Sequence, residues 1–268
     1  MGSKKISELP YIESPNITGL TAVVVSGVTY HTTLDDIKTL FRIPLSYTGT
    51  TLYSTTALAG TGFTLVDGVF IGLDSGFEAT NADGSIFIGS GSGYQAHSAS
   101  NSIFIGNQTG WLASNADDSN FIGHNAGYNA TESSFSNFFG NESGNGATRA
   151  HNSNFIGDNS GNGAVDAHYS NFIGASTGLN SINASGSVFV GHAAGFQQPN
   201  SAYSILLGHF SGTNFYGTNP IGKNNIIIGN SITLDTDREN SINIGSVIFG
   251  SGIHSPINRS EEHTSKLQ

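Results

Sequence analysis

The sequence contains a 17-residue repeat that recurs nine times in succession without insertion or deletion. Each copy has a glycine preceded by two large apolar residues, usually Phe-Ile, and a second glycine four residues later. The first glycine stands at Gly72, Gly89, Gly106, Gly123, Gly140, Gly157, Gly174, Gly191 and Gly208. Seventeen residues are too few for two helices and a turn, so the constant period predicts a β-solenoid with one coil per repeat.

The residue types within the repeat agree with a coil of short strands and tight corners. The glycines are expected at corners with positive φ, and the stretch before the first glycine is rich in β-branched and aromatic residues. Asn120, Asn137, Asn154 and Asn171 lie one repeat apart, where stacked amides can form a hydrogen-bonded ladder. We therefore predict an all-β fold, a β-solenoid or β-roll of about nine turns over 69–212.

The Phe-Ile pair also bears on assembly. Successive residues of a strand point to opposite faces, so the Phe column and the Ile column cannot both fill one thin coil. Whichever column faces outward forms an apolar stripe nine turns long, which is too large to remain exposed on a soluble monomer. The pattern therefore predicts oligomerisation through this stripe, without specifying the number of copies.

At these residues the sequence resembles the β-roll head of YadA-like trimeric adhesins, and more closely the Phe-Ile-Gly-x-x-Ala-Gly repeats of bacteriophage tail fibres. The resemblance covers roughly 69–212 and implies a homotrimer, with three coils intertwined or side by side about one axis. It also implies location in a virion appendage, contacts with other virion or tail proteins, and a host cell-surface glycan or protein as receptor.

The remaining segments are assigned by composition. Residues 1–43 are expected to form a small α+β module with strands at 21–25 and 28–32 and a short helix over 33–41; it is similar to N-terminal virion-attachment modules. Residues 44–68 are expected to be a Ser/Thr/Gly-rich linker, and 213–258 irregular β-structure. Residues 259–268 resemble a translated sequencing adapter and are excluded from fold reasoning.

Composition excludes several classes of function. The net charge of −10, from 19 acidic and 9 basic residues, gives no electrostatic basis for a nucleic-acid partner. The absence of cysteine excludes disulfides, thiolate chemistry and cysteine-ligated metals. Apolar runs are short, so no membrane insertion and no secretory signal peptide are expected.

An aromatic column after the second glycine is the candidate receptor site. Its members, which could stack on sugar rings or else pack on their neighbours, are Phe77, Tyr94, Trp111 and Tyr128. The acidic residues of the repeats fall at several different repeat positions, and the paired histidines His151/His168 and His192/His209 lack further ligands nearby in sequence. We therefore expect no enzyme activity, no cofactor and no metal.

The function predicted from the sequence is a structural and adhesive shaft of a phage tail fibre. Two alternatives stay open. One is the head of a bacterial trimeric adhesin at the cell surface, which has the same repeat physics. The other is a fibre-borne polysaccharide depolymerase, in which a cleft between chains brings two carboxylates together.

Overall fold

The computed structural model describes residues 68–213 and 220–250 in full, together with the backbone of Ser251 and of four earlier strands. The chain divides into two compact units, 1–45 and 46–268. In the first unit, β1 (Leu20–Val25) pairs antiparallel with β2 (Val28–Thr33), which confirms the two strands expected there. The expected helix over 33–41 lies outside the described residues.

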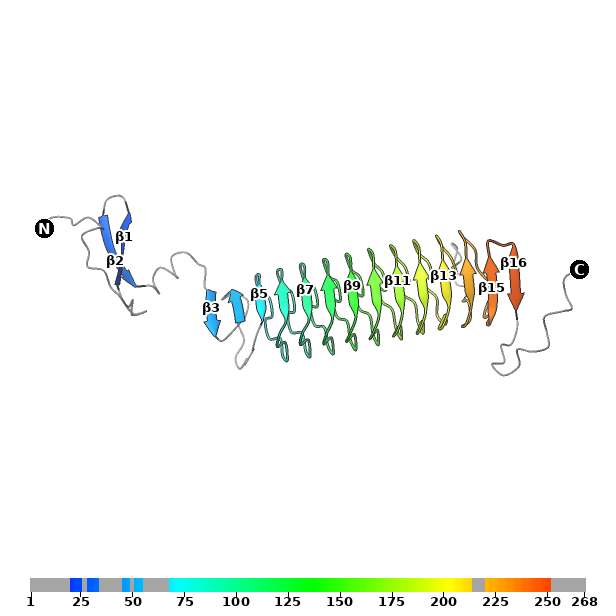
Figure 1. Cartoon of the computed structure of the whole chain (residues 1–268), viewed down its shortest axis with the longest axis horizontal. Coiled ribbons are helices and arrows are strands. Elements are labelled where there is room, and N and C mark those ends of the chain that lie inside the picture. Colours follow the sequence, from blue (N-terminus) through cyan, green and yellow to red (C-terminus); the bar gives the residue numbers. More distant parts are fainter. Residues whose placement is uncertain are drawn as a thin grey trace, which may run out of the picture. The chain divides into compact units, whose positions relative to one another are not determined.

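The second unit is a solenoid whose strands follow one another in single file (Figure 1). The strand order of its 14-stranded sheet is the chain order, with parallel pairing from β4 to β15 and an antiparallel final strand, β16. The strands are β3 (Leu45–Thr48), β4 (Thr51–Ser54), β5 (Val69–Ile71), β6 (Ile86–Ile88), β7 (Ile103–Ile105), β8 (Asn120–Ile122), β9 (Asn137–Phe139), β10 (Asn154–Ile156), β11 (Asn171–Ile173), β12 (Val188–Val190), β13 (Ile205–Leu207), β14 (Ile226–Ile228), β15 (Ser241–Ile244) and β16 (Ile248–Ser251). The described residues contain no helix, so the predicted all-β solenoid is confirmed.

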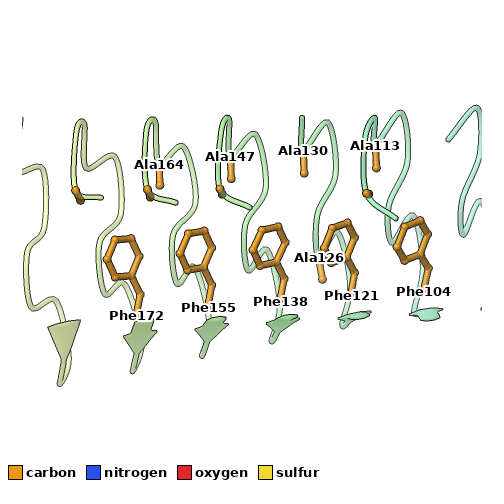
Figure 2. Packing of buried hydrophobic residues seen from close by; sticks show 14 of the residues in the cluster. Phe104, Ala113, Phe121, Ala126, Ala130, Phe138, Ala147, Phe155, Ala164 and Phe172 are labelled. Atoms are coloured by element: carbon orange, nitrogen blue, oxygen red, sulfur yellow. The ribbon is translucent and has the colours of Figure 1, made fainter. Parts of the chain in front are cut away.

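The Phe column fills the interior of the coil. Its members are Phe70, Phe87, Phe104, Phe121, Phe138, Phe155, Phe172 and Phe189, all fully buried, and Leu206 and Ile227 continue the column. From Phe87 onward these rings stack nearly parallel with centroids 4.6–4.8 Å apart, which is the spacing between adjacent strands. Figure 2 shows the rings facing the alanines of the opposite wall. Each coil is thus closed on a core only one large side chain wide.

The two repeat glycines are required for two different reasons. At Gly123 φ is +138°, and a Cβ there would collide with the backbone carbonyl of Gly140 in the next coil. At Gly127 φ is +63°, and a Cβ would overlap the ring of Phe121 in its own coil. The first glycine therefore permits coils to approach each other, and the second makes room for the core ring.

Buried hydroxyls satisfy the backbone groups that strands alone would leave unpaired. Ser102 Oγ donates to the carbonyl of Ala116 at 2.7 Å and accepts from the N–H of Ser119 at 3.1 Å. Equivalent bonds repeat along the solenoid at each serine that precedes a strand from β6 to β12. Since unpaired buried polar groups are costly, this column is a structural requirement of the coil.

The stack extends beyond the nine equal copies. Strands β14 and β15 continue the parallel ladder after coils of 21 and 16 residues, measured between Gly208, Gly229 and Gly245. Segment 44–68, expected to be an irregular linker, contributes β3 and β4 to the same sheet, and β4 pairs with β5. The reason is local, because Leu-Ser-Tyr-Thr and Thr-Leu-Tyr-Ser are strand-forming sequences beside an otherwise open sheet edge.

Candidate functional site

The predicted receptor residues form a continuous stack along one side of the solenoid, which we call the aromatic ladder. Ring centroids are 5.0 Å apart for Phe77 and Tyr94, 3.9 Å for Tyr94 and Trp111, and 6.3 Å for Trp111 and Tyr128. The planes of adjacent rings lie within 15° of each other, and all four side chains are half-buried. The structure therefore brings the four predicted residues together at consecutive coils.

The faces of the ladder rings are turned toward one another. Trp111 has a ring on each side in the stack, and a Cβ at Gly91 would meet the Trp111 ring at 2.7 Å. Sugar recognition by aromatic residues uses the ring face, so this arrangement favours mutual packing of the ladder over face-on ligand binding. A role of these residues in receptor binding stays a prediction.

The outward face of the long sheet carries the Ile column of the repeat, which we call the outer apolar column. Its members are Ile71, Ile88, Ile105, Ile122, Phe139, Ile156, Ile173, Val190, Leu207, Ile228 and Ile244, each half-buried or exposed. The residue two positions earlier in each strand points the same way and is also mostly aliphatic. The face is about 10 Å wide and about 50 Å long at ordinary strand dimensions, which is at the upper limit for an exposed patch on a monomer.

An asparagine ladder interrupts this face near its middle. Asn120 Nδ2 donates to Asn137 Oδ1 at 2.8 Å, Asn137 to Asn154 at 2.8 Å, and Asn154 to Asn171 at 2.7 Å. Each internal amide uses one donor hydrogen and its oxygen within the ladder. This confirms the structural role inferred from the spacing of the asparagines.

A second set of aromatic residues was not identified from the sequence. Phe135, Tyr169 and Tyr203, which we call the aromatic row, share one repeat position in every second coil, two residues before a strand. Their exposed fractions are 58%, 61% and 63%, and their φ values are +60°, +59° and +58°. The signal in the sequence was a 34-residue aromatic period superimposed on the 17-residue repeat.

Charged and histidine side chains line the coils near this row. His151 and His168 stack at 5.0 Å, and the ring of Tyr169 is nearly perpendicular to both at 5.4 Å. The Arg149 guanidinium donates to the Asp166 carboxylate of the next coil through Nε and Nη2. This hydrogen bond lowers the pKa of Asp166 and raises that of Arg149.

No metal centre or membrane-crossing helix is found in the described part of the chain. Within it, no three histidine or acidic side chains converge as metal ligands, and no helix long and apolar enough to cross a bilayer is present. His192 and His209 stack on each other at 5.1 Å, with Phe210 edge-on to both.

Comparison with known proteins adds no family: the chain matches no family model, and no curated protein or solved structure is significantly similar to it.

Proposed function

We propose that this protein is a self-associating structural rod that serves as the adhesive shaft of a virion appendage such as a phage tail fibre. The observation that carries the proposal is the outer apolar column, which runs along a rigid and uninterrupted parallel ladder. A rod-shaped scaffold with one apolar side is suited to coaxial packing with further copies of itself. The assignment to a tail fibre and to three copies rests on the sequence resemblance.

Self-association is supported by the distribution of side chains around the coil. The outer apolar column has no charged or polar member, whereas many positions of the coil away from this face carry Asn, Asp, Ser, Thr or Gly. Burial of this face against sister chains would remove its aliphatic side chains from water, at about 25 cal/mol for each Å² buried. The asparagine ladder would then lie inside the interface, where its remaining amide hydrogens need partners from another chain.

The test is the solution mass of the full chain by light scattering after size exclusion. We expect a species near three times the chain mass of 27.9 kDa. Ile156→Lys places a charge in the middle of the outer apolar column and should shift the species to a monomer. Ile182→Lys, at an exposed position away from that column, is the matched control and should leave the mass unchanged. A well-folded monomer of the unaltered chain would refute self-association, and a dimer would refute the trimer.

The two alternatives are separated by different observations. A downstream outer-membrane anchor encoded in the same gene would favour the bacterial adhesin over the virion appendage. Release of new reducing ends from host capsule or lipopolysaccharide would favour the depolymerase. The acidic side chains of the repeats are distributed over several repeat positions and form no single column, so the repeat pattern itself does not favour the depolymerase.

A further inference from the structure

The residues of the aromatic row adopt a strained backbone conformation although their side chains are largely exposed. A backbone φ near +60° is readily adopted by glycine and is tolerated by asparagine and aspartate, and the same coil position elsewhere holds Gly84, Asn101, Asp118, Asn152 and Gly186. Large aromatic residues are rare in this backbone region because the Cβ crowds the following carbonyl. Phe135, Tyr169 and Tyr203 adopt it while remaining more than half exposed, so burial offsets little of the strain. Strain without burial points to a role outside the coil.

The spacing of the row constrains what it contacts. The three rings occupy alternate coils, so consecutive rings are offset by about 9.6 Å along the axis at the ordinary strand spacing. This offset is close to the length of two consecutive hexose rings in an extended, β-linked chain. The intervening coils carry the short residues Asn152 and Gly186, and the Tyr203 ring lies over Gly186, where a Cβ would come within 2.8 Å of it. The aromatic row therefore consists of evenly spaced exposed rings that are separated by short side chains.

Hydrogen-bonding side chains lie beside the rings of the aromatic row, at another outward position of the coil. Three residues before the row position, successive coils carry Glu132, Arg149, Asp166 and Asn183. Arg149 and Asp166 pair with each other, and Ser185 Oγ lies 3.3 Å from His168 Nδ1 beside Tyr169. These side chains include acidic, basic and neutral groups, although the chain as a whole has a net charge of −10. Aromatic faces beside carboxylate, amide and guanidinium groups are suited to the apolar faces and hydroxyls of neutral sugars.

We propose that the aromatic row binds an extended, neutral, β-linked polysaccharide that runs parallel to the solenoid axis, with one aromatic ring at every second sugar. The proposal deepens the adhesive part of the proposed function and rests on it, while the oligomeric state does not enter the argument. The repeating ligand matches a repeating site, so each additional ring adds binding energy without a deep pocket.

The test measures retardation of the full chain in native gels that contain a soluble polysaccharide. The probes are hydroxyethyl cellulose and mixed-linkage β-glucan as extended neutral chains, amylose as a neutral chain of helical shape, and polygalacturonate as an anionic chain. We expect retardation by at least one extended neutral probe and weaker or no retardation by amylose and polygalacturonate. Absence of retardation by both extended neutral probes would overturn the proposal.

Substitutions can distinguish the row from a general effect of folding. The triple variant F135N/Y169N/Y203N introduces a residue that the coil already uses at this position, so its melting temperature should be equal or higher while affinity falls at least about tenfold. The matched control is Leu112→Asn, which replaces an exposed apolar residue at φ +55° outside both aromatic sets, where Asn129 and Asn180 occupy the equivalent position in other coils. Equal losses in the control, or retained affinity in the triple variant, would overturn the proposal.

A spacing variant tests the geometric argument itself. N152Y/Y169N keeps three aromatic residues at the row position but changes their separations from two and two coils to one and three. We expect it to bind the extended probe about as weakly as the triple variant, and unchanged affinity would refute the matched spacing. Light scattering on the same samples separates the two proposals, because loss of self-association with retained polysaccharide binding would refute only the oligomeric rod.

Discussion

Truncation of one core ring is the most direct test of how the coil is stabilised. Phe138 is fully buried, and its ring lies 4.6 Å from that of Phe121 and 4.8 Å from that of Phe155. Backbone hydrogen bonds join this coil to both neighbouring coils, so we expect little collapse of the space left by Phe138→Ala. A Phe→Ala cavity in a rigid core costs about 3–5 kcal/mol, and we expect a loss near the upper end of this range.

A graded series identifies the source of the loss. Phe138→Leu should cost less than about 1.5 kcal/mol, since Leu206 and Ile227 show that the column accepts aliphatic side chains. Phe139→Ile is the control, because its side chain lies on the outer apolar column where most other coils carry isoleucine; we expect a change within about 0.5 kcal/mol.

The free energy of unfolding would be measured by urea titration with circular dichroism at one fixed chain concentration, because self-association makes stability concentration-dependent. A loss below about 1 kcal/mol for Phe138→Ala, or one equal to that of Phe139→Ile, would refute a core built from a single stacked ring per coil.

Three further predictions concern the corners, the core alcohols and the ion pair. Gly123→Ala should cost at least about 2 kcal/mol because its Cβ meets the next coil, whereas Gly146→Asn, at φ +65° in open space, should stay within about 0.5 kcal/mol; thermal unfolding of both variants tests this. Ser181→Ala should raise stability by about 1 kcal/mol in urea titration, because the buried Ser181 Oγ has no hydrogen-bond partner; an unchanged or lower midpoint would contradict this. Because Arg149 lowers the pKa of Asp166, the ion pair should stabilise the fold above the unfolded-state pKa of Asp166, and this stabilisation should be lost as the pH falls through the pKa of Asp166 in the folded protein. NMR titration should show the Asp166 pKa rising in Arg149→Gln, and no change would exclude the interaction in solution.

Much of the solenoid was predictable because single positions of the repeat, such as the two glycines and the asparagine, each determine one structural feature of the coil. A constant repeat length with two glycines per repeat indicates a chain that completes one coil per repeat, and both glycines have positive φ in the structure. The asparagine ladder followed from spacing alone, since residues one period apart are stacked. These features are local or periodic, and no knowledge of the coil cross-section was needed to find them.

Other features depended on the cross-section. Four further positions per coil adopt left-handed backbone, for example Gln108, Leu112, Asn115 and Asp118; asparagine is common at them, but they also hold Leu, Gln, Glu and Arg, so no single residue type marks them. The aromatic ladder was found by its period, but whether its rings face solvent or each other depends on how the coil bends at that corner. The aromatic row was missed because its members recur only in every second coil and differ in identity.

The sequence by itself determined the coil length, the glycine corners and the presence of one apolar column inside and one outside, because these follow from period and strand alternation. Only the tertiary structure decided that Phe fills the interior and Ile faces outward. A ring stacked at the strand spacing fits between the opposing alanines, and the glycine four residues after the Phe-Ile-Gly glycine leaves room for it. Likewise, only the folded coil placed Phe135, Tyr169 and Tyr203 on one exposed edge, because their alignment depends on coils stacking in register over four turns.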